Sequence, residues 1–197
     1  MKTFTIGKKK IVLKEEWMVG FITTWIVGLL AHAYRFFNFL PIWDSIYNFT
    51  GVGSTYTLGR WFLGYAGLIT SMFDLPWVNG AFSLFYISIV VILLTEMFEI
   101  KNKGMIVLCA AIFVSFPTVV SSFAYMYTAD AYLLAFLLAT LAVYLTWCVK
   151  KWGTIAGMVC LAFAMGIYQA YATVAIVLVL LYICLLYTSP SPRDAHE

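Results

Sequence analysis

The chain has 197 residues, of which 63% are hydrophobic and only 11% are charged, and its mean hydropathy is +0.93. A soluble domain carries about 25% charged residues, so this composition excludes a water-soluble globular protein and indicates an integral membrane protein. The formal net charge of +3 says little by itself, because in membrane proteins the placement of Lys and Arg along the chain sets the orientation.

Several long apolar runs predict membrane-spanning helices, each of which needs about 20 mostly apolar residues. In chain order the predicted spans are 17–34, 81–98, 105–120, 131–149, 153–168 and 172–183. The last two are short and are separated at the sequence GIYQAY, which we interpret as a break between helices. The predicted fold is therefore all-α and polytopic, with five to six spans.

A shorter apolar run at 58–72 contains Arg60 and three glycines. We predict that it forms an interfacial or re-entrant helix on the outer surface rather than a span. The stretch before it, which contains Asp44 and a run of small polar residues, then becomes part of an external loop.

The lysines support this topology. They precede the first span, follow the second and follow the fourth, so alternating spans place all of them on one side: Lys2, Lys8, Lys9, Lys10, Lys14, Lys101, Lys103, Lys150 and Lys151. The positive-inside rule makes that side cytoplasmic. The other side receives Arg35, Asp44, Arg60, Asp74 and Asp130. We therefore expect a multi-pass protein of the cytoplasmic membrane with its N-terminus inside and its chemistry outside.

The last segment, 184–197, reads CLLYTSPSPRDAHE and changes composition abruptly. It resembles translated sequencing-adapter read-through, so we expect it to be non-native and exclude it from the fold. On this interpretation the chain is the N-terminal fragment of a longer protein and is inactive by itself.

No metal or cofactor site is predicted. The four cysteines, Cys109, Cys148, Cys160 and Cys184, lie in apolar runs without CxxC spacing, which is typical of packing residues. The two histidines, His32 and His196, are far apart in the sequence. A divalent metal has no support in these residues, and neither a phosphate-binding glycine loop nor a nucleic-acid-binding pattern is present.

Asp44 and Arg60 are the first candidates for chemistry. Asp44 lies in LPIWDSIYNF among aromatic residues near the membrane surface, where partial desolvation would favour a general base. It could equally cap a short surface helix that opens at WDSIY. Arg60, in TYTLGRWF, lies among apolar residues and needs an anionic partner such as a lipid phosphate, or else it snorkels to lipid headgroups.

Four further residues are weaker candidates. Arg35 closes the first span, where interfacial arginine is common. Asp130 either caps the fourth span or serves as an acid–base group. Tyr125 belongs either to an aromatic belt or to a platform for a sugar ring. Gln169, in GIYQAY, bonds either another helix or a substrate hydroxyl.

Taken together, the basic start, the first span, the loop from Asp44 to GRWF, and the sequences SFPTVVSSFAYMYTADAYLLAFLLATLAVYL and GIYQAYATVAI resemble the type II O-antigen glucosyltransferase (Gtr) family. That family belongs to the GT-C membrane glycosyltransferases. The resemblance implies transfer of a sugar, typically glucose, from a polyprenyl-phosphate carrier to a cell-surface glycan such as O-antigen. It also implies an essential acidic residue in the first external loop.

Under this resemblance Asp44 is the catalytic residue and Asp130 the reserve, because relatives often carry an acidic pair where Ser45 follows Asp44 here. Arg60 would hold the donor phosphate, and Arg35, Tyr125 and Gln169 would contact substrate. The implied partners are the lipid-linked donor, the glycan acceptor and the bilayer. The alternatives are a transporter or lipid-carrier flippase, and a non-catalytic membrane subunit of envelope assembly. Against transport, the interiors of the apolar runs are almost free of charge.

Overall fold

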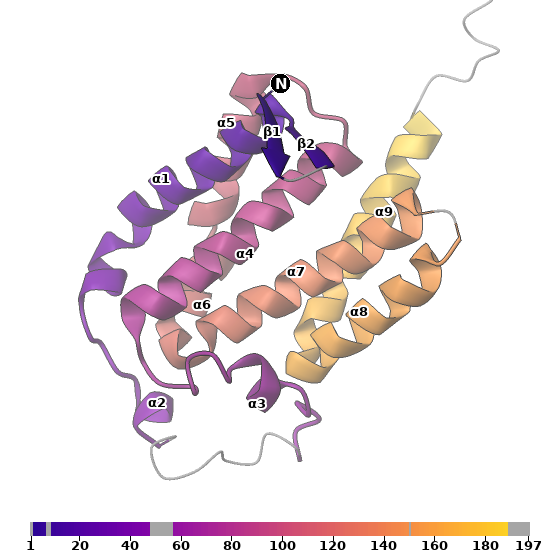
Figure 1. Ribbon diagram of the computed structural model, residues 1–197. Helices are drawn as coiled ribbons and strands as arrows, with labels where there is room; N and C mark the ends of the chain where they lie inside the picture. Colours follow the sequence, from indigo (N-terminus) through magenta and orange to yellow (C-terminus); the bar gives the residue numbers. More distant parts are fainter. Residues whose placement is uncertain (1, 7–8, 48–56, 150, 189–197) are drawn as a thin grey trace, which may run out of the picture.

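The computed structural model describes residues 2–6, 9–47, 57–149 and 151–188, which form a helical bundle with a two-stranded hairpin at its N-terminal end (Figure 1). The long helices are α1 (Glu15–Phe37), α4 (Pro76–Met97), α5 (Lys103–Ser115), α7 (Met126–Cys148), α8 (Gly153–Ile167) and α9 (Ala172–Thr188). The short helices are α2 (Trp43–Tyr47), α3 (Leu63–Ala66), α6 (Pro117–Ser122), η2 (Phe123–Tyr125) and η3 (Gln169–Tyr171). Strands β1 (Lys2–Ile6) and β2 (Lys9–Leu13) pair antiparallel.

The helices are long and apolar enough for a membrane protein, as the sequence predicts. Within the described ranges, four segments meet the length and hydropathy of a membrane span: Glu15–Phe37, Pro76–Met97, Lys103–Cys148 and Gln169–Tyr187. The third contains both α5 and α7, which run in opposite directions (Figure 1). The shorter apolar helix α8 follows it. The chain is thus a polytopic helical membrane protein.

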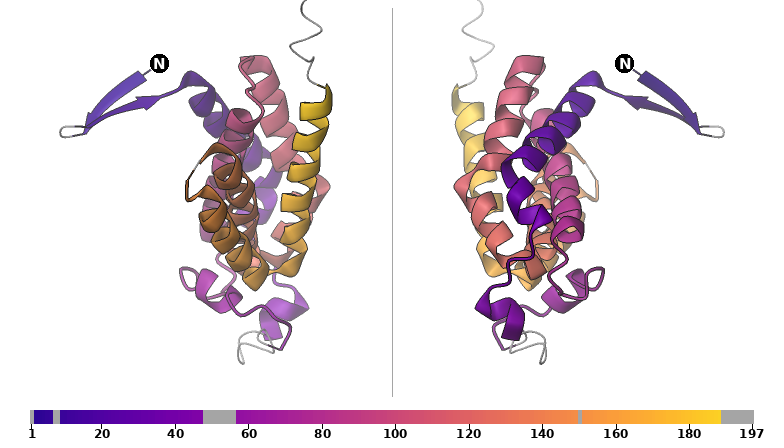
Figure 2. Two further views of the ribbon diagram at one scale, coloured as in Figure 1. Left: turned by 90° about the vertical axis from the view of Figure 1, so that its right-hand side faces the viewer. Right: turned by 90° about the vertical axis from the view of Figure 1, so that its left-hand side faces the viewer.

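Successive long helices alternate in direction, so the connections gather at two ends (Figures 1 and 2). One end holds the hairpin and the α4–α5 and α7–α8 connections, and it carries Lys14, Lys101, Lys103 and Lys151; we call it the lysine end. The other end holds α2, α3, α6 and η3, and we call it the loop end. These four lysines thus share one end, as the predicted topology requires.

Two segments differ from the sequence-based expectation. The span predicted at 105–120 is interrupted: α5 ends at Ser115, Phe116 is extended, and Pro117 opens α6, because the residue before a proline is disfavoured in helical conformation. The helix predicted at 58–72 is reduced to the four residues of α3. Ser71 and Met72 have φ of 53° and 55°, a left-handed conformation that a right-handed helix cannot include.

Helix α7 packs against α8, α4 and α9, and two clusters of buried residues lie along it. One cluster joins α7 to α1, α4 and α5 through large side chains such as Phe36, Leu84 and Met126. The other joins α7 to α8 and α3 through small residues, including Ala131, Ala135, Ala139 and Ala164. Small residues let membrane helices approach closely, so α7 and α8 form a rigid pair.

The lysine end is held by ion pairs to α1. Lys14 Nζ lies 2.7 Å from Glu96 of α4, and Lys103 Nζ lies 2.6 Å from Glu15. The Trp17 indole also donates to Glu96, over 2.6 Å. The hydrogen bond to Glu96 raises the pKa of Lys14 above its usual value. These pairs connect the start of α1 to the end of α4 and the start of α5.

Candidate active site

A polar cavity of about 510 Å³ lies at the loop end, within the size range of ligand sites. It is bounded by α2, the loop before α3, α6, the η2–α7 junction, η3 and the start of α9. Its lining combines one carboxylate, one guanidinium, five tyrosines and several hydroxyls: Asp44, Arg60, Thr118, Ser121, Ser122, Tyr125, Tyr127, Tyr132, Tyr168, Ala170, Tyr171, Thr173 and Val174. Segments more than 100 residues apart in the sequence therefore form one polar site.

Arg60 is the cation of this cavity. Its guanidinium carbon lies 4.4 Å from the centroid of the Tyr168 ring, and Nη1 is 3.5 Å from the hydroxyl of Tyr132. Its Nε is buried and has no hydrogen-bond partner, and no ion pair joins Arg60 to a described residue. A buried donor without a partner costs about 1–3 kcal/mol, and a charged donor costs more. Arg60 is therefore suited to bind an anion that enters the cavity.

The loop that carries Arg60 is anchored on the end of α8. The amide of Phe62 donates to the carbonyl of Gly166 over 2.8 Å, and Gln169 Nε2 donates to the carbonyl of Leu58 over 2.8 Å. Gly59 has a φ of 74°, and a Cβ there would lie 2.6 Å from the Gln169 amide. This turn thus requires glycine, and the two hydrogen bonds fix the position of Arg60.

Asp44 lies in the first turn of α2 and lines the cavity. The sequence WDSIY does open a short helix, but Ser45 rather than Asp44 makes the capping contacts, accepting from the Ile42 amide over 3.1 Å. The side chain of Asp44 is exposed at the surface of the protein. Tyr127 interacts electrostatically with both Asp44 and Arg60, which places the acid and the cation around one tyrosine.

Asp130 lies outside the cavity. It is 3% exposed, and its carboxylate accepts from Thr70 Oγ1 over 3.0 Å and from Asn79 Nδ2 over 3.4 Å. Because α7 begins at Met126 and has no side-chain cap, Asp130 is an interior helical residue and not the predicted cap. It joins the loop end of α7 to α4 and to the loop that contains Thr70.

The remaining predicted residues divide between the cavity and its supports. Tyr125 lines the cavity. Arg35 does not: its Nε donates to the Phe123 carbonyl over 2.8 Å, Nη2 donates to Ala124 over 3.0 Å, and Nη1 donates to the Leu40 carbonyl. Gln169 bonds the Arg60 loop instead of lining the cavity. Arg35 and Gln169 thus hold segments that border the site.

Sequence reasoning missed several lining residues. Tyr168 and Tyr171 lie on either side of Gln169 in the GIYQAY break and line the cavity. The break between two predicted spans was the sequence feature that could have indicated them. Ser121 and Ser122 follow the Pro117 interruption, which the hydropathy run concealed. Asp74, which the sequence placed on the external side without a role, has two carboxylate oxygens that are buried without a hydrogen-bond partner among the described residues.

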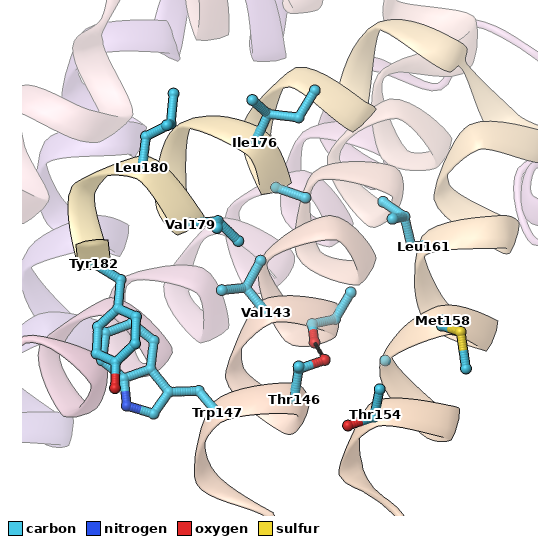
Figure 3. A pocket seen from close by; sticks show the side chains of 13 residues that line it. Val143, Thr146, Trp147, Thr154, Met158, Leu161, Ile176, Val179, Leu180 and Tyr182 are labelled. Carbon is cyan, nitrogen blue, oxygen red and sulfur yellow. Dashed lines mark hydrogen bonds between the residues drawn. The ribbon is translucent and has the colours of Figure 1, made fainter. Parts of the chain in front are cut away.

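A larger cavity, of about 710 Å³, lies between α7, α8 and α9 toward the lysine end. Figure 3 shows aliphatic side chains from the three helices around it, with Trp147 and Tyr182 at one side. It contains no acidic or basic side chain, so it lacks the groups for acid–base chemistry. Within the described residues, no group of three or more His, Cys, Asp or Glu could hold a metal ion.

Comparison with known families finds a match that covers most of the chain. The family model of glucosyl transferase GtrII matches residues 33–195. The chain belongs to this family. The GtrII match begins near the end of α1 and includes every residue of the polar cavity. It also covers most of 184–197, the segment predicted to be non-native; α9 continues to Thr188, and residues 189–197 lie outside the described part.

No curated protein and no solved structure matches this GtrII chain. Membership of the family supports a glucosyltransferase and therefore implies a sugar donor and a glycan acceptor. The membrane helices place this activity in a lipid bilayer. The alternatives of a transporter and of a non-catalytic subunit have no such support.

Proposed function

We propose that this GtrII protein transfers glucose from a polyprenyl-phosphate carrier to a cell-surface glycan such as O-antigen, at the loop end of a GT-C-type membrane domain. The observation that carries the proposal is the polar cavity lined by both Asp44 and Arg60, in which Arg60 Nε has no hydrogen-bond partner and no ion pair joins the guanidinium to a described residue. An acid and a cation are what transfer from a sugar phosphate needs: a base for the incoming hydroxyl and a charge for the leaving phosphate.

The proposed reaction is a single displacement with inversion. The acceptor hydroxyl oxygen forms a bond to the anomeric carbon, while the bond from that carbon to the phosphate oxygen breaks. Asp44 takes the hydroxyl proton, and the phosphate leaves with the bonding electron pair. Arg60 neutralises the charge that develops on the phosphate, since its planar fork matches phosphate oxygens. Tyr125 and Tyr127 supply ring faces and hydroxyls that can position the sugar.

The orientation follows from charge. Lysines gather at the end opposite the cavity, and the positive-inside rule makes that end cytoplasmic. The cavity then faces the outside of a bacterial cytoplasmic membrane, where a glycan acceptor and a lipid-linked donor can meet. This placement is also the reason to prefer a lipid carrier over a soluble cytoplasmic nucleotide sugar.

The test compares Asp44→Asn with Asp74→Asn in the complete gene product, with protein level measured by immunoblot. Asp74 lies at the same end but does not line the cavity, and its carboxylate oxygens are buried, so Asp74→Asn controls for the loss of a carboxylate at this end while the immunoblot controls for folding. Removing a general base lowers the rate by about 10²–10⁴-fold, and we expect that loss for Asp44→Asn alone, measured as labelled glucose transferred from polyprenyl-phosphate-glucose to lipopolysaccharide. Wild-type transfer by Asp44→Asn would refute the assignment.

A further inference from the structure

A second, apolar cavity of about 410 Å³ adjoins the polar one. Its lining is almost wholly hydrocarbon: Ile112, Phe113, Phe116, Thr118, Val119, Ser122, Leu133, Phe136, Tyr171 and Val174. Four of these residues also line the polar cavity, namely Thr118, Ser122, Tyr171 and Val174. The two cavities are therefore contiguous along α6 and the start of α9.

The break between α5 and α6 builds this apolar groove. Because Phe116 is extended and Pro117 restarts the helix, the wall is interrupted at the level of the cavity. Ile112 and Phe116 form an open rim, with 55% and 53% of their surface exposed. Below them Phe113 stacks on Phe136 with ring centroids 5.3 Å apart. The groove thus opens sideways from the bundle, toward the surrounding bilayer.

We propose that this groove binds the polyprenyl chain of the donor, which enters sideways from the bilayer between α5–α6 and α9; this inference rests on the proposed function. A lipid phosphate has an anionic head and an apolar tail joined at one point. The two cavities present matching groups in the same order. Arg60 lies in one, hydrocarbon side chains line the other, and the hydroxyls of Thr118 and Ser122 lie at their junction.

The larger apolar cavity in Figure 3 does not fit this role. It shares no lining residue with the polar cavity. It is formed by the lysine-end halves of α7 and α8 and by residues 175–182 of α9. A chain held there would lie outside the cavity that contains Arg60. Contiguity with the polar cavity is therefore what selects the α5–α6–α9 groove.

The test narrows the groove and varies the length of the donor chain. Ile112→Trp adds bulk at the rim, and Ile22→Trp, on the outer face of α1 with 53% exposure, is the matched control that lines neither cavity. If the tryptophan displaces about two methylene groups of the donor chain from the groove, at ~0.8 kcal/mol each, the affinity for the donor falls about ten-fold. We expect Ile112→Trp to lower kcat/KM by this factor for polyprenyl-phosphate-glucose and not for geranyl-phosphate-glucose, with Ile22→Trp unchanged for both. Equal effects on the two donors, or none, would overturn the inference.

A binding measurement separates this inference from the proposed function, because it needs no transfer. Polyprenyl phosphate without sugar, carrying a diazirine on its chain, is photolysed with the complete gene product in vesicles. We expect labelling of peptides from α5, α6 and the start of α9, reduced by unlabelled polyprenyl phosphate. Uniform labelling of all lipid-facing helices would show bulk lipid in the groove and would refute the inference. Absence of transfer by the wild type would instead refute the proposed function.

Discussion

The buried contacts of Asp130 allow its structural role to be separated from catalysis. Replacing Asp130 with Ala removes one good hydrogen bond, from Thr70 over 3.0 Å, and one long one, from Asn79 over 3.4 Å. Hydrogen bonds to a charged group contribute about 1.5–3 kcal/mol each. The long hydrogen bond from Asn79 contributes no more than the lower end of that range. The variant should therefore lose about 3 kcal/mol of stability, which corresponds to a fall in Tm of about 6–12 °C for a chain of this size.

Asp130→Asn should lose far less, because the amide keeps one acceptor oxygen and the Thr70 hydroxyl can rotate to accept. The assay is thermal unfolding in detergent, followed by size-exclusion chromatography, with glucose transfer measured below the transition. We expect Asp130→Asn to retain transfer and Asp130→Ala to retain it at low temperature. Thr70→Val, made alone and together with Asp130→Ala, completes a double-mutant cycle. The cycle should show a coupling free energy of about 0.5–3 kcal/mol. An Asp130→Asn protein that melts like the wild type but transfers no glucose would refute the structural role.

Three further predictions concern the cation, its loop and the helix pair behind it. Arg60→Ala should lower kcat/KM for the lipid donor by about ten- to one-hundred-fold, the equivalent of one or two charged hydrogen bonds. Arg60→Lys should recover only part of this loss, because lysine lacks the planar guanidinium that pairs with phosphate oxygens. An unchanged dependence of the rate on donor concentration would count against the binding of the donor phosphate by Arg60. Gln169→Ala removes the bond to the Leu58 carbonyl, at about 1 kcal/mol, and should raise the donor KM several-fold without touching the cavity. A Cβ at Gly157 would lie 2.6 Å from the Ala142 carbonyl, whereas one at Gly64 meets nothing within 4 Å. Gly157→Ala should therefore lower the melting temperature by the equivalent of about 1–3 kcal/mol, with Gly64→Ala as its neutral control.

The helical fold could be predicted because, in lipid, length and hydropathy nearly determine which segments are helices. The predicted ranges therefore overlap the long helices of the structure. The differences arise where a local backbone preference overrides hydropathy. Pro117 divides a continuous apolar run, and the left-handed Ser71 and Met72 end an apolar segment that composition alone would make helical. The β1–β2 hairpin was not predicted, because we read that region only as a basic segment.

The site was predictable only in part, for a geometrical reason. Asp44, Arg60 and Tyr125 do line one cavity. Asp130, Arg35 and Gln169 are also polar or charged, but their side chains bond neighbouring chain segments instead of lining the cavity. Which way a polar side chain turns depends on the rotation of its helix against others, and that information is not contained in the local sequence. The tyrosines of GIYQAY were missed because their partners lie on distant segments.

The short length of α8 affects where the reaction takes place relative to the lipid. Its 15 residues extend about 22 Å, whereas the hydrocarbon core of a bilayer is about 30 Å thick. The loop that carries Arg60 is bonded to Gly166, at the end of this short helix. If the lysine end of α8 lies at the opposite headgroup plane of a bilayer of this thickness, Arg60 lies below the headgroup plane on its own side. A donor phosphate could then reach the guanidinium without leaving the depth of its own leaflet, and the glycan acceptor would have to reach inward to meet it.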